Sequence, residues 1–367
     1  MAVSHKNFSK EERLILSDFD ITGFCGALTN WYQHHGRQLP WRQTHNPYNI
    51  WLSEIMLQQT QVDTVKPYYL RFIESFPTVE ALAAAPMDDI YKLWEGLGYY
   101  RRASHLKEAA QTIVNDFGGI FPDTYEDILK LKGIGTYTAS AISSIAFHIP
   151  KGVIDGNTLR IISRIFNRQD NIAKDATKKA YQAIMDKLIA HTSPSDFNQG
   201  MMDLGATICT PKKPDCANCP VQSFCEAFRQ DTVRLLPVNI RNKNKTDIYY
   251  ITGILRCKDK YFIVKNKDGL LNDLYGLAQY EVESPVSFEE QFFEEFHTPV
   301  RLLAYEKEFR HIFSHRVWHM SVYCGEIDLD GAQTAPELKE HMYALEELQR
   351  LPIPTAHRKI LEALTCI

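Results

Sequence analysis

Four of the eight cysteines crowd into one stretch, with the spacing Cys209-x6-Cys216-x2-Cys219-x5-Cys225. Thiolates this close together form a compact cage of soft ligands, which selects zinc or an iron–sulfur cluster. Disulfides are disfavoured because a reducing compartment keeps thiols free. Zinc sites usually carry two Cys-x2-Cys pairs, and this stretch has one. The spacing by itself leaves zinc and a [4Fe–4S] cluster about equally favoured.

Glu54 lies in a second stretch that could carry chemistry. Helical spacing places it on one face with Ile50, Trp51 and Leu57. Apolar neighbours desolvate a carboxylate, which raises its pKa and lets it hold a proton at neutral pH as a general acid. The simpler alternative is a glutamate at the rim of the helix in a surface salt bridge, and without other evidence that alternative is favoured.

Asp155 stands in a glycine-flanked turn before an apolar helix expected over residues 158–167. The commoner role of such a residue is a helix N-cap or a turn. The same position near a helix N-terminus would also keep the carboxylate ionised. One acid held neutral and one held charged is how paired carboxylates divide the cleavage of a glycosidic bond. Glu54 and Asp155 are therefore candidates for such a pair.

Gly133 and Gly135 precede another apolar helix, expected from Tyr137 to about Phe147. Glycines ahead of a helix let the first backbone N–H groups point outward, where they and the helix dipole can hold a phosphate. A single Gly-x-Gly more often marks an ordinary turn. Tyr99, which follows two glycines, could enter a base stack as a wedge, although packing at a helix junction is the commoner role.

The elements that must position these residues change character along the chain. Residues 21–228 carry apolar side chains at three- and four-residue spacing, which predicts an all-α domain over residues 1–228 with the cysteine loop at 209–225. Residues 229–247 are predicted to be a basic linker, either along a phosphate backbone or as a solvated tether. From residue 248 to 367 the period changes to two, which predicts a smaller α+β domain.

Within that α+β domain the expected elements are strands and helices at the following positions: strands at residues 248–255, 261–264 and 317–323, and helices at residues 287–296 and 354–364. Residues 1–20 carry no motif, and a short leading helix is expected there. The predicted fold class is thus multidomain, with an all-α domain followed by an α+β domain.

Composition limits the class of protein. A chain of 367 residues with a net charge of −4 is long enough for two domains, but it does not bind nucleic acid through bulk charge. No apolar run approaches the roughly 20 residues of a membrane span. The first residues lack the apolar core and cleavage site of a signal peptide. We therefore expect a cytoplasmic protein that does not bind membranes.

Several motifs together resemble one family, the MutY-type adenine-DNA glycosylases of the helix-hairpin-helix superfamily. The resemblance covers nearly the whole chain and rests on an ordered set of segments: residues 39–42, 51–60, 96–100, 131–140, 153–157 and 201–206, and the four cysteines. It implies a helix-hairpin-helix glycosylase domain with an iron–sulfur loop, followed by a MutT-like (Nudix-like) domain. It also implies excision of adenine mispaired with 8-oxoguanine or guanine from double-stranded DNA, by a monomer associated with the nucleoid.

The resemblance assigns roles to matching positions. Glu54 would protonate adenine at N7 and then help to activate water. Asp155 would stabilise the oxocarbenium-like sugar, with Tyr137 and Asn157 in support. The remaining assignments are the adenine pocket (Arg37, Trp41, Gln199), the orphaned purine (Gln59, Thr60, Leu97, Tyr99), the [4Fe–4S] ligands (Cys209, Cys216, Cys219, Cys225) and the phosphate-binding hairpin (Gly133, Gly135).

Two departures refine what the resemblance implies. Lyases of the same superfamily use a lysine two residues after the second hairpin glycine, and here that position is Tyr137, which cannot form a Schiff base. The MutT-like half lacks the Gly-x5-Glu-x7-Arg-Glu box of the hydrolases, so it should recognise rather than hydrolyse. The segment Phe313-Ser314-His315 matches the family loop that contacts 8-oxoguanine, and a strand-end turn is the alternative.

Two other classes compete with an enzyme: a catalytically silent iron–sulfur DNA-binding protein and a metal-stapled interaction scaffold. Glu54 and Asp155 argue against both, since either acid could be lost without harm to binding. The visible absorption of an iron–sulfur cluster would separate it from colourless zinc.

Overall fold

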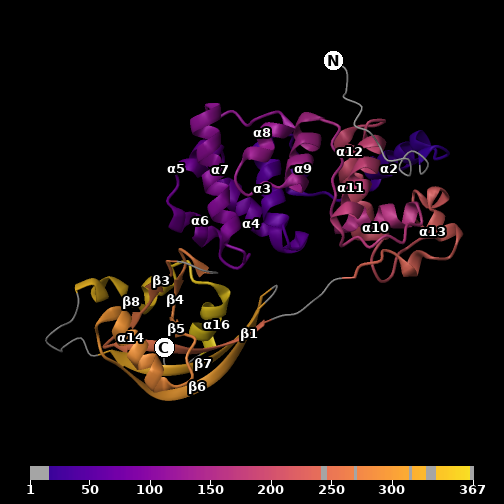
Figure 1. Ribbon diagram of the computed structural model, residues 1–367. Helices are drawn as coiled ribbons and strands as arrows, with labels where there is room; N and C mark the ends of the chain where they lie inside the picture. The colour runs from indigo at the N-terminus through magenta and orange to yellow at the C-terminus, as the bar shows by residue number, and fades with distance from the viewer. Residues whose placement is uncertain (1–15, 241–245, 268–270, 314–315, 328–335, 364–367) are drawn as a thin grey trace. The chain divides into compact units, whose positions relative to one another are not determined.

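The computed structural model describes residues 16–240, 246–267, 271–313, 316–327 and 336–363. The chain divides into two compact units, residues 1–84 with 104–241 and residues 85–103 with 242–367. The first is helical and the second is built on a sheet, as Figure 1 shows by the change from coiled ribbons to arrows. The predicted fold class is confirmed. The predicted borders at 228 and 247 stay a prediction, and most of the expected leading helix lies outside the described residues.

Helices account for nearly all regular structure before residue 230. They are α2 (Ile21–His35), α3 (Pro47–Leu57), α4 (Val62–Ser75), α5 (Val79–Ala84), α6 (Met87–Trp94), α7 (Arg101–Phe117), α8 (Tyr125–Lys130), α9 (Thr136–Phe147), α10 (Gly156–Ile165), α11 (Asp175–Ile189), α12 (Pro194–Asp203) and α13 (Glu226–Arg229). Short 3-10 turns occupy Pro40–Arg42, Gln222–Phe224 and Val233–Leu235.

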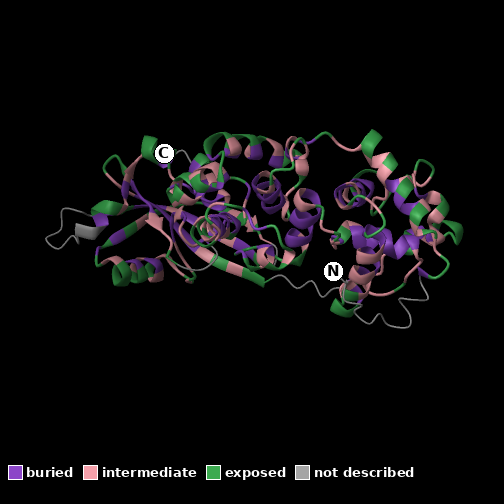
Figure 2. Cartoon of the chain, turned by 90° about the horizontal axis from the view of Figure 1, so that it is seen from above, coloured by how far each residue is buried: buried purple, intermediate pink, exposed green. Residues whose placement is uncertain are grey.

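Helix α3 is buried almost all round, and Figure 2 shows such buried segments in purple. Asn46 caps it by accepting a hydrogen bond from the Tyr48 N–H at 2.9 Å, and Pro47 occupies its first turn. Trp51 and Leu52 are fully buried. Because this helix has no solvent face, Glu54 cannot reach a surface salt bridge, and the alternative raised for it from the sequence is wrong.

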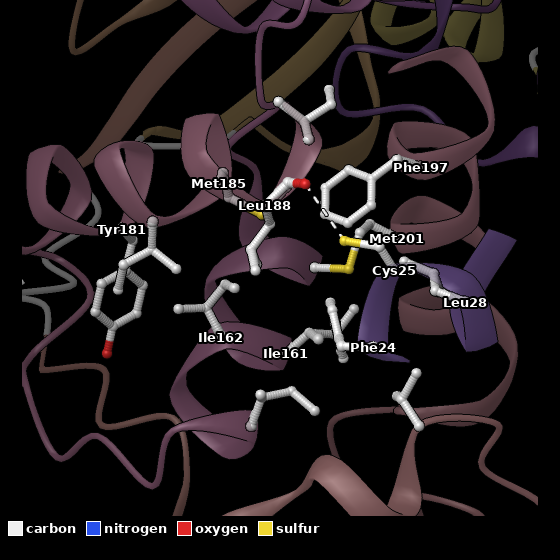
Figure 3. Packing of buried hydrophobic residues seen from close by; sticks show 14 of the residues in the cluster. Phe24, Cys25, Leu28, Ile161, Ile162, Tyr181, Met185, Leu188, Phe197 and Met201 are labelled. Carbon is white, nitrogen blue, oxygen red and sulfur yellow. Dashed lines mark hydrogen bonds between the residues drawn. The ribbon is translucent and has the colours of Figure 1, made fainter. Parts of the chain in front are cut away.

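A core of buried apolar side chains packs α10 and α12 against α2 and α11. Figure 3 shows this core, in which Phe24 and Leu28 of α2 lie close to Ile161 of α10 and Phe197 of α12. These four side chains are fully buried. At roughly 1.5–3 kcal/mol for each fully buried large apolar side chain, such a core holds its helices firmly. The two helices that it positions carry Asp155 at the start of α10, and Gln199 and Asp203 on α12.

A π-helical turn, Leu204–Ile208, follows α12 and leads directly into the cysteine loop. Single π turns inside helical runs occur often at functional sites. Gly205 lies in this turn, where an added Cβ would come within 2.6 Å of the Asn157 Cβ. Only a residue without a side chain allows the two backbones to approach so closely.

The second unit is built on a mixed sheet with the strand order β6-β7-β1-β2-β8, and β5 pairs with β1. The strands are β1 (Thr246–Cys257), β2 (Lys260–Phe262), β3 (Val264–Lys265), β4 (Tyr275–Gly276), β5 (Ala278–Tyr280), β6 (Val300–Ile312), β7 (Arg316–Ile327) and β8 (Met342–Ala344). Helices α14 (Pro285–Phe296), α15 (Leu345–Leu348) and α16 (Thr355–Ala363), the 3-10 helix Pro336–His341 and α6 from earlier in the chain also belong to this unit.

The two longer helices of this unit contact opposite faces of the sheet. Phe288 of α14 packs in one core with Ile251 of β1. His357 of α16 instead reaches Gln279, the partner of Thr252 in the register of β1 and β5. Successive residues of a strand point to opposite faces, so Ile251 and Thr252 identify the two sides. None of the described helices is both long and apolar enough to cross a membrane.

Candidate active site

One cavity of ≈ 200 Å³ in the helical unit collects side chains from five separate stretches of sequence. Glu54 of α3 and Asp155 at the start of α10 both line it. The other predicted site residues on its wall are Arg37, Trp41, Thr60, Tyr137, Asn157 and Gln199. The two acids therefore face one chamber, as a shared reaction on one bound group requires.

The buried surroundings of Glu54 favour the protonated form of its carboxyl group. It is 4% exposed, and its Oε2 atom accepts no hydrogen bond from any of the described residues. Burial raises the pKa of Glu54 to about 7, against the opposing effects of the Tyr137 hydroxyl and the charge of Arg42. The charge of Asp155 adds to the rise. A carboxyl with this pKa carries its proton for much of the time at neutral pH and can donate it.

Asp155 serves as the N-cap of α10. Its Oδ1 accepts hydrogen bonds from the N–H groups of Asn157 at 3.0 Å and Thr158 at 2.7 Å. The Thr158 hydroxyl in turn accepts from the Asp155 N–H at 2.7 Å, which completes a capping box. Because both bonds go to Oδ1, the second oxygen accepts nothing from the described residues. The N-cap role and a position on the cavity wall are thus compatible in one residue.

Asp203, at the end of α12, is a second buried carboxylate beside the cavity, and it is fully paired. The backbone N–H and Nε of Arg37 donate to its two oxygens at 2.8 Å each. Arg42 donates to both oxygens as well, at 2.6 and 2.8 Å. Burial alone would raise the pKa of Asp203, but the hydrogen bonds and charges of Arg42 and Arg37 outweigh burial and hold it below its usual range. Asp203 lies in one of the segments that resemble the family, but sequence analysis assigned no role to it.

Gln199 has a defined amide orientation. Its Nε2 donates to the Ser195 hydroxyl at 3.0 Å and to the Ser195 carbonyl at 3.4 Å, one turn earlier on α12. A backbone carbonyl can only accept, so the amide nitrogen must lie on that side. The amide oxygen therefore lies on the opposite side of the group from Ser195, and Gln199 lines the cavity. Sequence reasoning had no signal for Ser195, because the pair forms only when the helix fixes both residues.

Arg160 connects the N-terminal end of α10 to the cysteine loop. It is 5% exposed, and its Nε donates to the Cys209 carbonyl at 2.8 Å. Its Nη2 donates to Asn157 Oδ1 at 2.9 Å and to the Gly205 carbonyl at 2.8 Å. The position of Asn157 on the cavity wall therefore depends on where the loop holds Cys209.

The four predicted metal ligands lie together. Cys209, Cys216, Cys219 and Cys225 line one hollow, and the guanidinium of Arg164 donates to Cys209 Sγ at 3.2 Å. Within the described part of the chain, no group of three or more His, Cys, Asp or Glu side chains is arranged to hold a single metal ion. The donor set of four thiols around one hollow fits an iron–sulfur cluster as well as zinc, so the side chains alone do not choose between the two metals.

The hairpin glycines begin α9 as predicted. Gly133 has φ +76°, and an added Cβ would meet the Cβ of His105 at 2.7 Å. Gly135 is the N-cap of α9 and supplies no side chain to it, so the first N–H groups of the helix stay open to an anion.

The residues predicted to surround the orphaned purine are divided between the units. Gln59 and Thr60 follow α3, and Gln59 adopts a left-handed backbone with φ 59°. Leu97 and Tyr99 belong to residues 85–103 of the second unit; Leu97 is buried, and Tyr99 is 48% exposed with φ 52°. Left-handed backbone in residues other than glycine is uncommon and concentrates at functional sites.

The predicted loop that contacts 8-oxoguanine is described only at its first residue. Phe313 directly follows β6, and its ring packs on Trp318 at a centroid distance of 4.8 Å. Ser314 and His315 lie outside the described residues.

Three segments of the chain match known protein families. Residues 52–187 match the HhH-GPD superfamily of base excision DNA repair proteins, residues 209–225 match the iron–sulfur binding domain of endonuclease III, and residues 251–363 match the NUDIX domain. The second match decides between the two metals left open by spacing: the loop binds an iron–sulfur cluster, [4Fe–4S] in this family.

Curated relatives extend the similarity along the chain. The adenine DNA glycosylase of Buchnera aphidicola (subsp. Baizongia pistaciae) is 34% identical over 351 residues, which are 92% of this chain and 95% of that protein. The mouse adenine DNA glycosylase is 41% identical over 220 residues, 58% of this chain and 43% of its own length. Among solved structures, a thermostable thymine-DNA glycosylase matches with a TM-score of 0.52 and 31% identity over 57% of this chain and 97% of its own.

Proposed function

Because the chain belongs to the adenine DNA glycosylase family, which removes adenine in base excision repair, we propose that it hydrolyses the N-glycosidic bond of adenine mispaired with 8-oxoguanine or guanine. The observation that carries the proposal is the single cavity shared by Glu54 and Asp155. Adenine in a duplex is buried by stacking, so it must leave the helix to reach such a cavity, at a cost of roughly a few kcal/mol that is least at a mispair.

Each acid has one task in the proposed reaction. Glu54, protonated because it is buried, donates its proton to adenine N7 and makes the base a better leaving group. As the bond from the sugar C1′ to adenine N9 breaks, its electron pair leaves with the base and positive charge develops on the sugar. The carboxylate of Asp155 stabilises that charge. Ionised Glu54 then takes a proton from the water that attacks C1′.

The cavity wall can distinguish adenine from other bases. Gln199, oriented by Ser195, presents Oε1 to accept from the exocyclic amino group of adenine. Guanine and thymine carry a carbonyl oxygen at the corresponding position, which would face this acceptor without a hydrogen bond. Since a thymine-DNA glycosylase shares the fold, this contact rather than the fold supports adenine.

The position of Tyr137 supports a glycosylase without lyase activity. Tyr137 lies in the first turn of α9 and lines the cavity. The lyases of the same superfamily carry an amine nucleophile at this position. A phenol cannot form a Schiff base, so the abasic strand should remain intact. Borohydride should trap no covalent adduct between the protein and an abasic duplex, and an adduct would defeat this part of the proposal.

DNA phosphate binding is proposed for the hairpin glycines. The uncapped N–H groups that follow Gly135, together with the dipole of α9, suit one phosphate without reading sequence. Binding that does not depend on base sequence suits an enzyme that searches duplex DNA for a mispair. A monomer and a cytoplasmic location remain predictions.

The second unit is proposed to identify the base opposite adenine. Phe313, Ser314 and His315 are the proposed contacts to 8-oxoguanine. The double substitution of Ser314 and His315 by Ala should weaken the preference for 8-oxoguanine over guanine and spare slow cleavage opposite guanine. Unchanged discrimination would refute the assignment.

A single-turnover assay tests the whole proposal. Duplexes with adenine opposite 8-oxoguanine, guanine or thymine are incubated with excess protein, and released adenine is measured. We expect release opposite 8-oxoguanine and guanine, and none opposite thymine. A matched duplex with thymine opposite guanine tests the activity of the structural relative, and release of thymine in place of adenine would overturn the proposal.

A further inference from the structure

The segment of residues 151–154, which has no regular secondary structure, leads directly into Asp155. Because neither a helix nor a sheet pairs its backbone, its buried N–H and C=O groups need other partners. Val153 is 0% exposed, and Gly152 lies so close to α11 that an added Cβ would meet the Met185 Cβ at 2.5 Å. The position of Asp155 on the cavity wall therefore depends on the side chains that hold this segment.

Asn198 of α12 holds the segment on both sides of Gly152. Its Oδ1 accepts from the Val153 N–H at 3.1 Å, and its Nδ2 donates to the Lys151 carbonyl at 2.8 Å. Nδ2 also donates to the Ser144 hydroxyl of α9 at 2.8 Å. The side chain is 0% exposed, and an N–H group and a carbonyl on its two sides allow the amide one orientation. The oxygen and both N–H groups of the amide are thus in use.

Helix α11 holds the groups that lie between these two bonds. The Gly152 N–H donates to the Asp186 carboxylate at 2.9 Å, and the Gly152 carbonyl accepts from the Gln182 amide at 2.7 Å. Gln182 also donates to the same Asp186 oxygen at 2.8 Å. Side chains of two helices therefore fix every backbone group from the Lys151 carbonyl to the Val153 N–H.

Asn198 connects three elements that each place a residue on the cavity wall. It directly precedes Gln199 on α12, and through Ser144 it bonds to α9, the helix of Tyr137. Through the segment it bonds to the backbone that ends at Asp155. A reacting group displaced by about 1 Å can lose much of its effect on the rate. We propose that Asn198 is a positioning residue, which fixes the Asp155 carboxylate relative to Tyr137 and Gln199.

Because this inference rests on the proposed release of adenine, one measurement is chosen to be independent of that reaction. Hydrogen exchange of peptides covering residues 151–155 is compared in the native protein and in Asn198→Leu, which keeps a similar volume but has no polar atom. These peptides should exchange at least about 10-fold faster in the variant, and peptides from α4 should exchange as in the native protein. Native exchange at residues 151–155 would overturn the inference whether or not the native protein releases adenine.

Single-turnover release and duplex binding separate positioning from folding. Asn198→Leu should release adenine roughly 10-fold to 100-fold more slowly than the native protein. Its affinity for the mispaired duplex should stay within about 3-fold of native, because the segment is buried and Asp155 acts on the reaction. Ser144→Ala removes the one bond of Asn198 that does not reach the segment, and it should slow release by less than about 3-fold. A rate loss in Asn198→Leu matched by an equal loss of affinity would contradict positioning.

Asn198→Asp supplies a conservative variant that low pH should rescue. The new carboxyl group keeps an oxygen for the Val153 N–H, but when ionised it has no proton to donate to the Lys151 carbonyl. Burial should raise its pKa, and the protonated form can donate to that carbonyl and restore both bonds. Relative to the native protein at the same pH, its release should be roughly 10-fold slower at pH 8 and within about 3-fold at pH 5.

Two controls accompany this comparison. Asn198→Leu should show the same deficit at pH 8 and pH 5, since it gains no donor at low pH. Asn30→Asp makes the same substitution as Asn198→Asp at an exposed position on α2, and it should release adenine like the native protein at both pH values.

Gln182→Leu covers the case in which the Asn198 variants do not fold. Gln182 is half-buried on α11, and its loss frees the Gly152 carbonyl while Asn198 stays in place. It should slow release by about 3-fold to 10-fold with native duplex affinity. Native release by Asn198→Leu, or by Gln182→Leu where Asn198→Leu does not fold, would overturn the inference. An Asn198→Asp deficit that is equal at both pH values would overturn it as well.

Discussion

Two buried carboxylates beside one cavity have opposite fates. Glu54 and Asp203 are 4% and 1% exposed, so burial is nearly the same for both. Asp203 accepts four hydrogen bonds from Arg37 and Arg42, and its pKa is lowered. Glu54 has an oxygen without any hydrogen bond, and its pKa rises to about 7. The hydrogen-bonding and charged partners of each carboxyl group, rather than how deeply it is buried, therefore decide which acid keeps its proton.

The contrast between the two acids also suggests why Arg37 and Arg42 are paired with Asp203. Two guanidinium groups border the cavity in which the proposed mechanism requires a protonated Glu54, and the charge of Arg42 already lowers the pKa of Glu54. Asp203 balances that positive charge and holds both arginines at the wall. One buried acid is thus kept charged so that the other can remain neutral. Four predictions test this comparison.

The largest effect is expected from Glu54→Gln. The amide keeps the size of the side chain but cannot supply a proton, so single-turnover adenine release should fall by about 100-fold to 10,000-fold. Binding of the mispaired duplex should persist, as measured by gel shift. The matched control is Glu74→Gln on the exposed face of α4, which should cleave normally. A residual native rate in Glu54→Gln would remove Glu54 as the acid.

Asp203→Asn should have the next largest effect. It retains an oxygen acceptor for one arginine but leaves the two guanidinium charges unbalanced, which should lower the pKa of Glu54. Native release should decline as pH rises through about 7, where Glu54 loses its proton. In Asp203→Asn that decline should begin at lower pH, with a rate at pH 7.5 about 10-fold below native for each pKa unit lost.

Asp196→Asn is the control for Asp203→Asn, because it makes the same change near the other end of α12. Its pH profile should match the native one. A variant Asp203→Asn that is slower at every pH by the same factor would show that Asp203 acts only through structure.

Gly205→Ala tests position without a change of charge. The new Cβ would press on Asn157, which Arg160 also holds, and should displace the start of α10 from the cavity. We expect release about 10-fold slower with an unchanged pH profile. Gly26→Ala, where an added Cβ meets nothing within 4 Å, is the control and should behave like the native protein. A pH profile shifted in Gly205→Ala would contradict the separation of position from charge.

The smallest effect concerns stability. The pKa of Glu54 is raised in the folded state, so the folded protein is stabilised by the bound proton at low pH and loses that contribution as pH rises through about 7. Glu54→Gln has no such loss. Its unfolding free energy should exceed the native value by up to about 3 kcal/mol at pH 8 and match it near pH 4. Equal denaturation midpoints at both pH values would show that Glu54 is not buried as an acid.

Sequence periodicity predicted much of the fold, and one strand shows where it fails. The helical run from Tyr137 to Phe147 and the strand at 317–323 were predicted and lie in α9 and β7. Strand β6 was not predicted. It is the edge of the sheet and is exposed along most of its length, so it carries no alternation of apolar and polar residues for a period to reveal.

What the sequence determined by itself is local. The four cysteines are close in the chain, Asp155 caps the helix that follows it, and the apolar neighbours of Glu54 lie within one helical turn, so spacing alone made each a candidate. Tertiary structure decided which distant residues meet: Asp203 joins Arg37 from 166 positions away, and Arg160 joins Cys209 from 49. Hydrogen bonds and charges act over a few ångströms of space, regardless of separation along the chain. For that reason the protonation of Glu54 and the orientation of Gln199 could be read only from the folded molecule.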